Sequence, residues 1–474
     1  MIVARPARTL LAAVLFAVTL VPPAHAQTPP PRDLSRWEAL ARDLLRELIE
    51  INTTESSGST ARAAHAMAAR LRAAGFPDSD VVVVENALRK GNLIARLRGK
   101  GGGRKPILLL SHLDVVEAKA EDWTLPPFRF IEQDGTFYGR GVADDKDDGA
   151  IHLALLMRLK AEGFVPDRDI VVALTTDEEG GPDNGVEWLL RHRPELIDAE
   201  YALNEGGGGR MRDGRRLSHD VQASEKKVQN FRLEVTNPGG HSSRPVKDNA
   251  ITRLSQALAK IGAFDFPVRL NEITRAYFSR SAAITGGPVG AAMRAVALDP
   301  RDSAAVAVLA VDPTYNAQLR TTCVATMLEG GHAKNALPQR ARANVNCRIL
   351  PDESPEDVRR TLVRVIGDSQ VSVTPDGTFH DSPPSALTAE VMGQVERITA
   401  EMWPGVPVIP TMSTGATDGL YLRNAGIPTY GVAGQFYGET GAHGMNERIP
   451  AQAFYESLEF MYRLVKSLTR GEMS

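Results

Sequence analysis

Residues 170–181 read I-V-V-A-L-T-T-D-E-E-G-G, and this stretch decides the fold. It begins with a continuous apolar run rich in β-branched residues, which is typical of a strand buried on both faces of a sheet. It ends in three successive carboxylates, Asp177, Glu178 and Glu179, followed by two glycines. Three adjacent acids repel one another, so a positive partner is expected, and a metal ion is the simplest candidate. The alternative is a solvated turn with acids at the start of a helix.

Similar apolar runs lie on either side of this stretch. Residues 107–110 precede S-H-L-D, and residues 200–203 precede N-E-G. Between and around these runs, apolar residues recur at helical spacing over residues 33–51, 59–74, 145–159 and 186–191. This alternation predicts an α/β layered domain with a mostly parallel sheet. The polar residues should collect at the strand ends, where such sheets place their sites.

A different pattern occupies the middle of the chain. An alternating strand over 231–236 is followed by a helix over 251–261, an Ala-rich helical stretch over 272–311, two strand-like runs within 321–350 and a helix from Ser354. After about residue 380 the α/β pattern resumes. The sequence therefore predicts a main domain in two parts, 27–222 and 381–474, interrupted by a smaller inserted α+β domain, 223–380.

The first 26 residues read as a secretory signal peptide. Two arginines precede an apolar stretch over 10–21, and Ala24-His25-Ala26 forms an A-x-A cleavage site. A first core helix is the alternative, but prolines follow at once. We expect an exported protein, with the periplasm as its destination in a Gram-negative source. No later stretch predicts a membrane span.

Composition excludes some partners. The 474 residues are 43% hydrophobic and 24% charged, as in an ordinary globular protein, and the net charge is −3. No basic run is long enough to indicate nucleic-acid binding.

The chain has two cysteines, Cys323 and Cys347. They lie on two strand-like runs, and a hairpin centred near Asn335 would place them opposite one another. In an oxidising compartment this favours a cross-strand disulfide over two buried free thiols.

Five separated positions carry side chains that can bind metal ions. Most lie at a predicted strand end or beside a glycine turn, which favours one shared site. They are His112 with Asp114, Asp144 with Asp145, Glu178 with Glu179, Glu205, and His443. Oxygen and imidazole ligands without cysteine suit zinc in an open catalytic site, and cobalt or manganese would also fit.

The motifs around these residues resemble those of the di-zinc metallopeptidases. They occur in the family's order: S-H-L-D-V-V, G-R-G-V-A-D-D-K, T-D-E-E-G, N-E-G and G-A-H-G-M-N-E. This family includes aminoacylase, bacterial glutamate carboxypeptidase, yeast carboxypeptidase S and succinyl-diaminopimelate desuccinylase. The resemblance covers nearly the whole chain after the leader. It implies two zinc ions per chain, and a lid and dimerisation role for the inserted domain.

The resemblance also implies a role for each ligand. Asp144 would bridge both ions, His112 and Glu205 would complete the first site, and Glu179 and His443 would complete the second.

Two further carboxylates would serve the chemistry. Asp114 would fix the imidazole tautomer of His112. Glu178 would act as the general base on a water activated between two ions about 3.5–4 Å apart. One residue departs from the family pattern, because Asp147 stands where the family usually has glycine.

The resemblance places a second set of residues on the substrate. His241, in G-G-H-S-S, would bind the oxyanion, often from the partner subunit, which implies a homodimer. The alternative for His241 is a structural role in a capped turn. Asn335 matches a family asparagine, and Arg348 matches the arginine that holds a substrate carboxylate. Gly415 and Thr417 belong to a turn whose backbone N–H groups would bind the same carboxylate.

These observations predict an exported di-zinc hydrolase that cleaves an amide bond next to a free carboxylate. Its substrates would be small peptides or N-acyl amino acids, so a carboxypeptidase, a dipeptidase and a deacylase all remain open. One alternative is a binding protein that kept the fold and lost the chemistry, but every expected ligand is present. A sugar-cleaving enzyme with paired carboxylates is another, and it would leave His112 and His443 unexplained.

Overall fold

The fold is described from a computed structural model, which covers residues 33–101 and 103–470. The predicted signal peptide, residues 1–26, lies outside the described residues. The described residues from Leu34 onward form one compact unit. Among the described helices, none combines the length and the apolar character that a membrane crossing requires.

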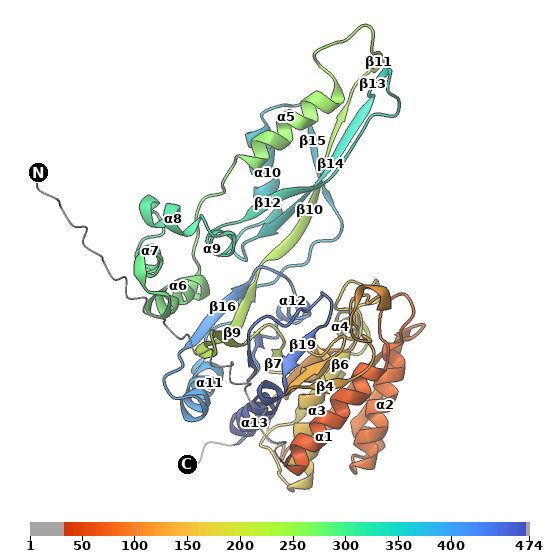
Figure 1. The fold of residues 1–474 in the computed structure, drawn as a ribbon, viewed down its shortest axis with the longest axis vertical. Helices are drawn as coiled ribbons and strands as arrows, with labels where there is room; N and C mark the ends of the chain where they lie inside the picture. The colour runs from red at the N-terminus through yellow and green to blue at the C-terminus, as the bar shows by residue number, and fades with distance from the viewer. Residues whose placement is uncertain (1–32, 102, 471–474) are drawn as a thin grey trace, which may run out of the picture. The chain divides into compact units, whose positions relative to one another are not determined.

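A ten-stranded sheet forms the centre of this unit (Figure 1). Its strands are β1 (Val81–Ala87), β2 (Lys90–Leu97), β3 (Ile107–His112), β6 (Ile170–Thr175), β7 (Tyr201–Asn204), β8 (Gly208–Arg212), β9 (Arg215–Glu225), β16 (Val408–Ser413), β17 (Thr429–Gly431) and β18 (Phe436–Tyr437). Their order is β1-β2-β6-β3-β7-β17-β9-β8-β18, and β16 pairs with β9. The central strands β6, β3, β7 and β17 are parallel. This confirms the predicted α/β fold with a mainly parallel sheet.

Helices cover both faces of the large sheet, which explains the continuous apolar run of β6. Ile170, Val172 and Leu174 pack into one core, whereas Val171 and Ala173 pack into another on the opposite face. The first face is covered by α1 (Arg36–Glu50), α2 (Thr60–Ala73), α3 (Lys146–Ala161), α11 (Ala389–Met402) and α13 (Ala451–Leu468). The second face is covered by α4 (Gly185–His192) and α12 (Gly419–Asn424).

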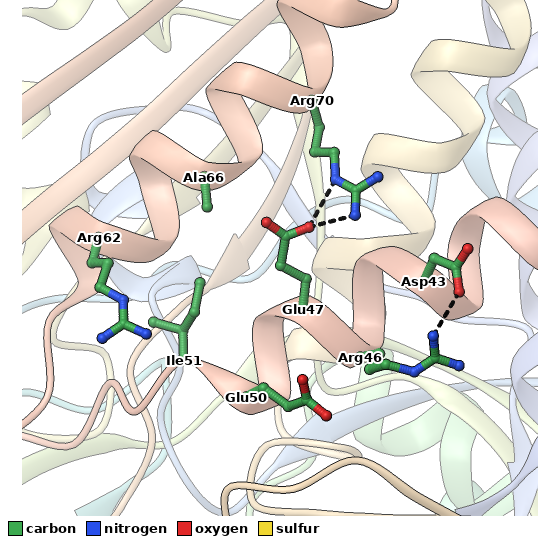
Figure 2. A pocket seen from close by; sticks show the side chains of 8 residues that line it. All are labelled: Asp43, Arg46, Glu47, Glu50, Ile51, Arg62, Ala66 and Arg70. Atoms are coloured by element: carbon green, nitrogen blue, oxygen red, sulfur yellow. Dashed lines mark hydrogen bonds and ion pairs between the residues drawn. The ribbon is translucent and has the colours of Figure 1, made fainter.

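A groove of about 710 Å³ lies between α1 and α2 (Figure 2). Its charged side chains largely pair with each other, as in the ion pairs Glu47–Arg70 at 2.7 Å and Asp43–Arg46 at 3.1 Å. None of the residues that line it is a predicted ligand. The groove is therefore separate from the strand ends that carry the predicted ligands.

The middle of the chain forms a second sheet, which is antiparallel. Its strands, in spatial order, are β12 (Thr322–Gly330), β14 (Arg340–Ile349), β10 (Lys227–Thr236) and β15 (Ser372–Asp376). Helices α5 (Ala250–Gly262) and α10 (Pro355–Ile366) cover one face of it. Beyond the ends of β10 and β14, β11 (Gly240–His241) pairs with β13 (Ala336–Leu337) in a separate short sheet (Figure 1).

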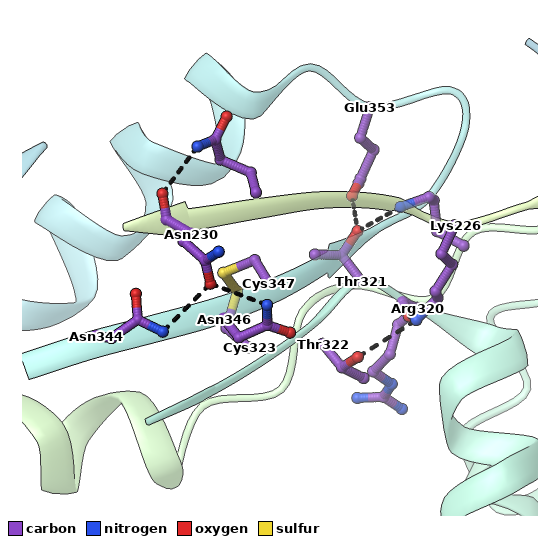
Figure 3. Close-up of a disulfide and its surroundings, with 12 residues drawn as sticks. Lys226, Asn230, Arg320, Thr321, Thr322, Cys323, Asn344, Asn346, Cys347 and Glu353 are labelled. Atoms are coloured by element: carbon purple, nitrogen blue, oxygen red, sulfur yellow. Dashed lines mark hydrogen bonds between the residues drawn. A yellow bond between two sulfur atoms is a disulfide. The ribbon is translucent and has the colours of Figure 1, made fainter. Parts of the chain in front are cut away.

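A disulfide joins the edge strand β12 to β14 (Figure 3). Cys323 lies directly opposite Cys347 in the strand register, and their sulfur atoms are bonded at 2.02 Å. This confirms the predicted cross-strand bridge and the predicted hairpin.

The Ala-rich stretch forms four helices: α6 (Glu272–Thr285), α7 (Gly287–Leu298), α8 (Ser303–Leu309) and α9 (Pro313–Leu319). They share a core with Ile409 of β16. Arg280 of α6 also donates a hydrogen bond to the carbonyl of Val408, at 2.9 Å. These helices, although they fall inside the range 223–380, therefore pack against the large sheet, and β9 extends that sheet to Glu225.

Some elements have no counterpart in the sequence prediction. They include β8, β9, β16 and β18 of the large sheet, β15 of the second sheet, and a small sheet made of β4 (Ile131–Gln133), β5 (Thr136–Tyr138) and β19 (Arg448–Pro450). The described residues also contain three short 3₁₀ helices: η1 (Asp78–Asp80), η2 (Ala120–Asp122) and η3 (Pro194–Leu196).

Candidate metal centre

The predicted ligands come from the ends of neighbouring parallel strands. His112 is the last residue of β3, Glu179 follows β6, and Glu205 follows β7. Because β6, β3 and β7 are adjacent and parallel, their carboxyl ends meet at one edge of the sheet. Two loops complete the set: Asp144 precedes α3, and His443 lies between β18 and β19.

The structure brings all five predicted ligands together in two clusters that share Asp144. The first cluster is His112, Asp144 and Glu205, and the second is Asp144, Glu179 and His443. Within each cluster the candidate ligand atoms all lie within 4.8 Å of one another.

The two carboxylate oxygens of Asp144 lie close to the histidines of different clusters. Its Oδ1 lies 3.0 Å from Nε2 of His112, and its Oδ2 lies 3.0 Å from Nε2 of His443. In the second cluster, Nε2 of His443 also lies 3.0 Å from Oε2 of Glu179. In the first, Oε2 of Glu205 lies 3.9 Å from Nε2 of His112. A carboxylate placed in this way can bridge two ions.

Carboxylates outnumber imidazoles in both clusters, and this imbalance shifts the pKa values of the side chains there. Burial, and then the charge of Glu205, raise the pKa of Glu178 to about 10. Burial also raises the pKa of Glu205 to about 8, although His112 opposes the shift. The hydrogen bond to Asp144 raises the pKa of His443 to about 9. Two imidazoles thus face an excess of partly buried carboxylates, so bound cations would compensate this charge.

The chemistry of these donors fits divalent metal ions. Each cluster offers one imidazole nitrogen and two carboxylates, and the described part of the chain has no free cysteine. Each cluster thus offers three protein ligands from the described residues, a number typical of catalytic rather than structural zinc sites. Cobalt or manganese could also occupy such a set.

Asp114 organises the site in a different way from the prediction. Nδ1 of His112 donates to the backbone oxygen of Asp114 at 2.9 Å, whereas the nearest carboxylate oxygen of that residue lies at 3.8 Å. The carboxylate instead accepts the backbone N–H groups of Glu178 and Glu179, at 3.2 and 3.0 Å. Asp114 therefore fixes the imidazole through its carbonyl and fixes the acidic turn through its side chain.

Asp177, the first of the three adjacent acids, has a protein partner. Nζ of the buried Lys90 lies 2.5 Å from Oδ1 of Asp177. The other carboxylate oxygen of Asp177 accepts the N–H of Asp183 at 3.1 Å. The positive partner expected for the three acids is therefore Lys90 in the case of Asp177. Glu178 and Glu179 lie instead at the metal-ligand clusters. This pairing holds a turn in which Asp177 has a φ of 62°.

His241 is the last residue of β11, and Asn335 directly precedes β13, the strand that pairs with β11. The N–H of Ser242 donates to the carbonyl of Asn335 at 2.9 Å. Nδ1 of His241 accepts the N–H of Ser243 at 3.2 Å, so its Nε2 carries the proton of the neutral ring. Both predicted residues are exposed, and within the described part of the chain His241 contacts none of the clustered ligands.

Arg348 lies on the sheet face opposite the helices α5 and α10. Burial lowers the pKa of its guanidinium below the usual value. Among the described residues, no hydrogen-bond or ion-pair partner for this guanidinium was found, which leaves the group able to bind an anion. An amide cluster of Asn230, Asn344 and Asn346 lies on the same face (Figure 3).

The predicted role of the 413–418 turn does not match its contacts. The N–H of Gly415 donates to Oγ of Ser413 at 3.0 Å, and the N–H of Thr417 donates to the buried carboxylate of Glu225 at 3.0 Å. Both amides therefore already have acceptors within the protein. In this conformation they are not available to a substrate carboxylate.

Sequence reasoning missed the residues that brace the ligand loops. Arg140 and Glu447 form a buried ion pair at 2.7 Å between the loops that carry Asp144 and His443. Asp418, also buried, accepts a hydrogen bond from Asn184 at 2.6 Å, and burial raises its pKa to about 7. Arg140, Glu447 and Asp418 each stand in a motif that was recognised through a neighbouring residue, and Asn184 stands in none. Their place in these motifs was the only signal in the sequence.

The sequence matches a known family over most of its length. Residues 108–467 match the peptidase family M20/M25/M40. The chain is 29% identical over 404 residues to the "probable carboxypeptidase S-like 2" of Dictyostelium discoideum. This alignment covers 83% of this chain and 77% of the relative. It is 28% identical over 463 residues to the human "N-fatty-acyl-amino acid synthase/hydrolase PM20D1", covering 92% and 89%.

The fold has a solved counterpart as well. An M20 family metallo-carboxypeptidase from Sulfolobus solfataricus superposes with a TM-score of 0.66 and 18% sequence identity. The match covers 90% of this chain and 99% of that structure. At this identity the likeness extends to the fold alone.

Proposed function

Because the chain belongs to peptidase family M20/M25/M40, we propose that it is an exported di-zinc hydrolase that cleaves an amide bond next to a free carboxylate. The observation that carries the proposal is the pair of ligand clusters sharing Asp144. His112 and Glu205 would hold one ion and Glu179 and His443 the other. The bound ions would activate water and polarise the scissile carbonyl.

Glu178 is the residue proposed to move the proton. It is partly buried and feels the charge of Glu205, and its backbone is fixed by the carboxylate of Asp114. Bound cations would return its side chain to the carboxylate form, which can accept a proton from the attacking water. Glu178 would then pass this proton to the leaving amine.

Two residues of the inserted domain are proposed to hold the substrate. The guanidinium of Arg348 has no partner among the residues that the structure describes, and it suits the free carboxylate. His241 presents Nε2–H as a donor, which suits the oxyanion of the transition state. Asn335, beside His241, would offer its amide to the same part of the substrate.

The substrate class follows from the chemistry and from the relatives. The family relatives described above include a carboxypeptidase S-like protein and an N-fatty-acyl-amino acid hydrolase by name. Both names fit an amide bond adjacent to a free carboxylate. Substrates would therefore be small peptides or N-acyl amino acids.

A substrate panel tests this proposal. The zinc-loaded protein would be given dipeptides, N-acetyl and long-chain N-acyl amino acids, and the same compounds with the carboxylate amidated. Release of amine from the free acids but not from the amidated controls is expected. Hydrolysis of neither set by protein with two bound metals would reject the function, and equal hydrolysis of both would reject the carboxylate requirement.

Export is proposed from the leader and the disulfide together. A cross-strand disulfide is favoured in an oxidising compartment. Fractionation of expressing cells tests it: the mature protein should appear outside the cytoplasm and lack residues 1–26.

A homodimer is proposed through the inserted domain. β12 is an edge strand of its sheet and carries exposed apolar side chains, with Val324, Met327 and Leu328 each at least 60% exposed. An edge strand of this kind can pair with a second chain. A partner would also bring a second His241 to a site that its own His241 does not contact.

A further inference from the structure

The loops that carry Asp144 and His443 are joined by one buried ion pair. Nη1 of Arg140 lies 2.7 Å from Oε2 of Glu447, and both side chains are at most 3% exposed. Arg140 lies four residues before Asp144, and Glu447 lies four residues after His443. The ion pair therefore ties together two segments that are about 300 residues apart in the sequence.

Each partner of this pair also binds the backbone of the opposite loop. Glu447 accepts the N–H of Gly141 at 2.9 Å and the N–H of Ala143 at 2.8 Å. Arg140 donates through Nη2 to the carbonyl of Gly444 at 2.9 Å. The contact thus fixes the residue directly before Asp144 and the residue directly after His443.

The tip of the second loop depends on this support. His443 has a φ of 60°, and its side chain is 58% exposed. Its neighbour Gly444 has one further backbone contact, donating to the carbonyl of Gly441 at 2.8 Å. An exposed histidine on such a loop would lose its orientation if the base of the loop moved.

The two metal clusters depend on the ion pair to different degrees. In the second cluster, Asp144 and His443 both stand on loops that the pair holds. In the first cluster only Asp144 does, because His112 ends β3 and Glu205 follows β7. A disturbance of the pair should therefore weaken the second site more than the first.

We propose that Arg140 and Glu447 are positioning residues that set the affinity and geometry of the second metal site, an inference that rests on the proposed two-metal function. The pair is electrically neutral, so it orders two ligands without adding charge to an already acidic site. Carboxylates and other groups that orient metal ligands typically contribute about 10- to 100-fold to metal affinity.

Stepwise metal binding tests the inference. Metal-free wild type and Glu447→Gln would be titrated with Co²⁺, with binding followed by calorimetry and by the visible absorption of each bound ion. The first equivalent should bind as in wild type. The second should bind about 10- to 100-fold more weakly, with an altered absorption spectrum.

The chain offers a matched control. Glu225 is fully buried, pairs with Nη1 of Arg423 at 2.8 Å and accepts a backbone N–H, that of Thr417. Its side-chain partners among the described residues are Gln222, Ser382, Thr417 and Arg423, none of which lies on either ligand loop. Glu225→Gln should therefore lose a comparable ion pair while both equivalents of Co²⁺ bind as in wild type.

A second variant keeps the inference testable if Glu447→Gln does not fold. Arg140→Lys keeps the charge but replaces the rigid planar fork of the guanidinium with one flexible ammonium, so the fixed two-armed geometry toward Glu447 and Gly444 is lost. It should weaken the second equivalent selectively. Unchanged binding of both ions, equal weakening of both ions, or the same defect in Glu225→Gln would overturn the inference. If wild type itself binds fewer than two ions, the proposed function fails instead.

Discussion

Glu178 and Glu179 are adjacent in the chain but have different surroundings. Glu179 lies 3.0 Å from His443, whereas Glu178 is surrounded by the buried charges of Glu205 and Asp114. Both backbone N–H groups are held by one carboxylate, that of Asp114, which fixes the turn between them. Neighbouring side chains can therefore divide the work, one holding metal and the other moving a proton.

Substitution of each acid separates these roles. Glu178→Ala should lower kcat by about 10²- to 10⁴-fold and keep two metal ions, because a general base is lost but no ligand is. Glu179→Ala should lose metal from the second site as well as activity. Metal analysis after dialysis, together with kinetics, checks both variants. An equal loss of metal from the two would show that the roles are wrongly divided.

His219 gives the protein a specific sensitivity to acid. It lies among aromatic side chains, with Nδ1 2.7 Å from Oγ1 of Thr399 and Nε2 donating to the carbonyl of Ala433 at 2.7 Å. Burial lowers its pKa from 6.5 to about 4. Below pH 6.5 the unfolded chain binds a proton that the folded protein does not, so stability falls as the pH falls toward 4.

The size of this effect can be measured by substitution. A shift of this size corresponds to a loss of up to about 3 kcal/mol across the window from pH 6.5 to 4. His219→Gln keeps a polar side chain that does not titrate, so its unfolding free energy should depend less steeply on pH in that window. Denaturant unfolding at several pH values gives both slopes. Identical slopes would contradict this account of His219.

At the scale of elements, the disulfide secures the edge of the inserted sheet. β12 pairs with only one strand, β14, and most of its residues are exposed. The bond between Cys323 and Cys347 closes a loop of 24 residues near the start of β12. It therefore holds the strand beside Arg348, which follows Cys347.

Removal of this bond should destabilise the protein. The double variant Cys323→Ser, Cys347→Ser should lose about 3 kcal/mol of unfolding free energy, mainly because the unfolded chain gains freedom. Denaturant unfolding of wild type, with and without reductant, measures the same quantity. Mass spectrometry of the non-reduced digest should contain the linked peptides. Two alkylatable thiols in the native protein would contradict the bond.

The elements that the sequence predicted share a simple physical signal. The runs at β3 and β6 are apolar on both faces because helices cover both faces of the sheet. These strands could therefore be recognised in the sequence, and so could the acids that follow them. β9 could not, because it buries polar residues such as His219, Gln222 and Glu225 that interrupt any apolar pattern. The helices α6 to α9 were recognised as helical, but their packing on β16 depends on contacts that no local pattern encodes.

The same distinction applies to the site. The ligands were predictable because each stands in a short motif at a strand end or a glycine turn. Arg140 and Glu447 were not, because a buried ion pair between residues 307 positions apart resembles two ordinary surface charges in the sequence. The amides of Gly415 and Thr417 were misjudged for a similar reason, since their acceptors include the distant Glu225.

At the scale of the whole molecule, the central question is whether one chain completes a site. His241 lies in the short sheet of β11 and β13 and contacts none of the clustered ligands in the described part of the chain. In a two-fold dimer, each site would combine Glu178 of one subunit with His241 of the other. This arrangement makes a numerical prediction.

Mixing two inactive variants tests the arrangement. When Glu178→Ala and His241→Ala are refolded together in equal amounts, roughly half of the dimers should be mixed. In a mixed dimer one site carries both substitutions and the other carries neither, so about a quarter of wild-type activity should return. If His241 serves its own chain, every site keeps one substitution and no activity returns.

The most direct test of the account is a metal titration of the whole enzyme. The protein would be freed of metal with a chelator, and zinc would be added back in steps while bound metal and amide hydrolysis are measured together. The account predicts no hydrolysis without metal, and full activity only when two ions are bound per chain, since two clusters share Asp144. Full activity in metal-free protein, or saturation of both binding and activity at one ion per chain, would contradict it.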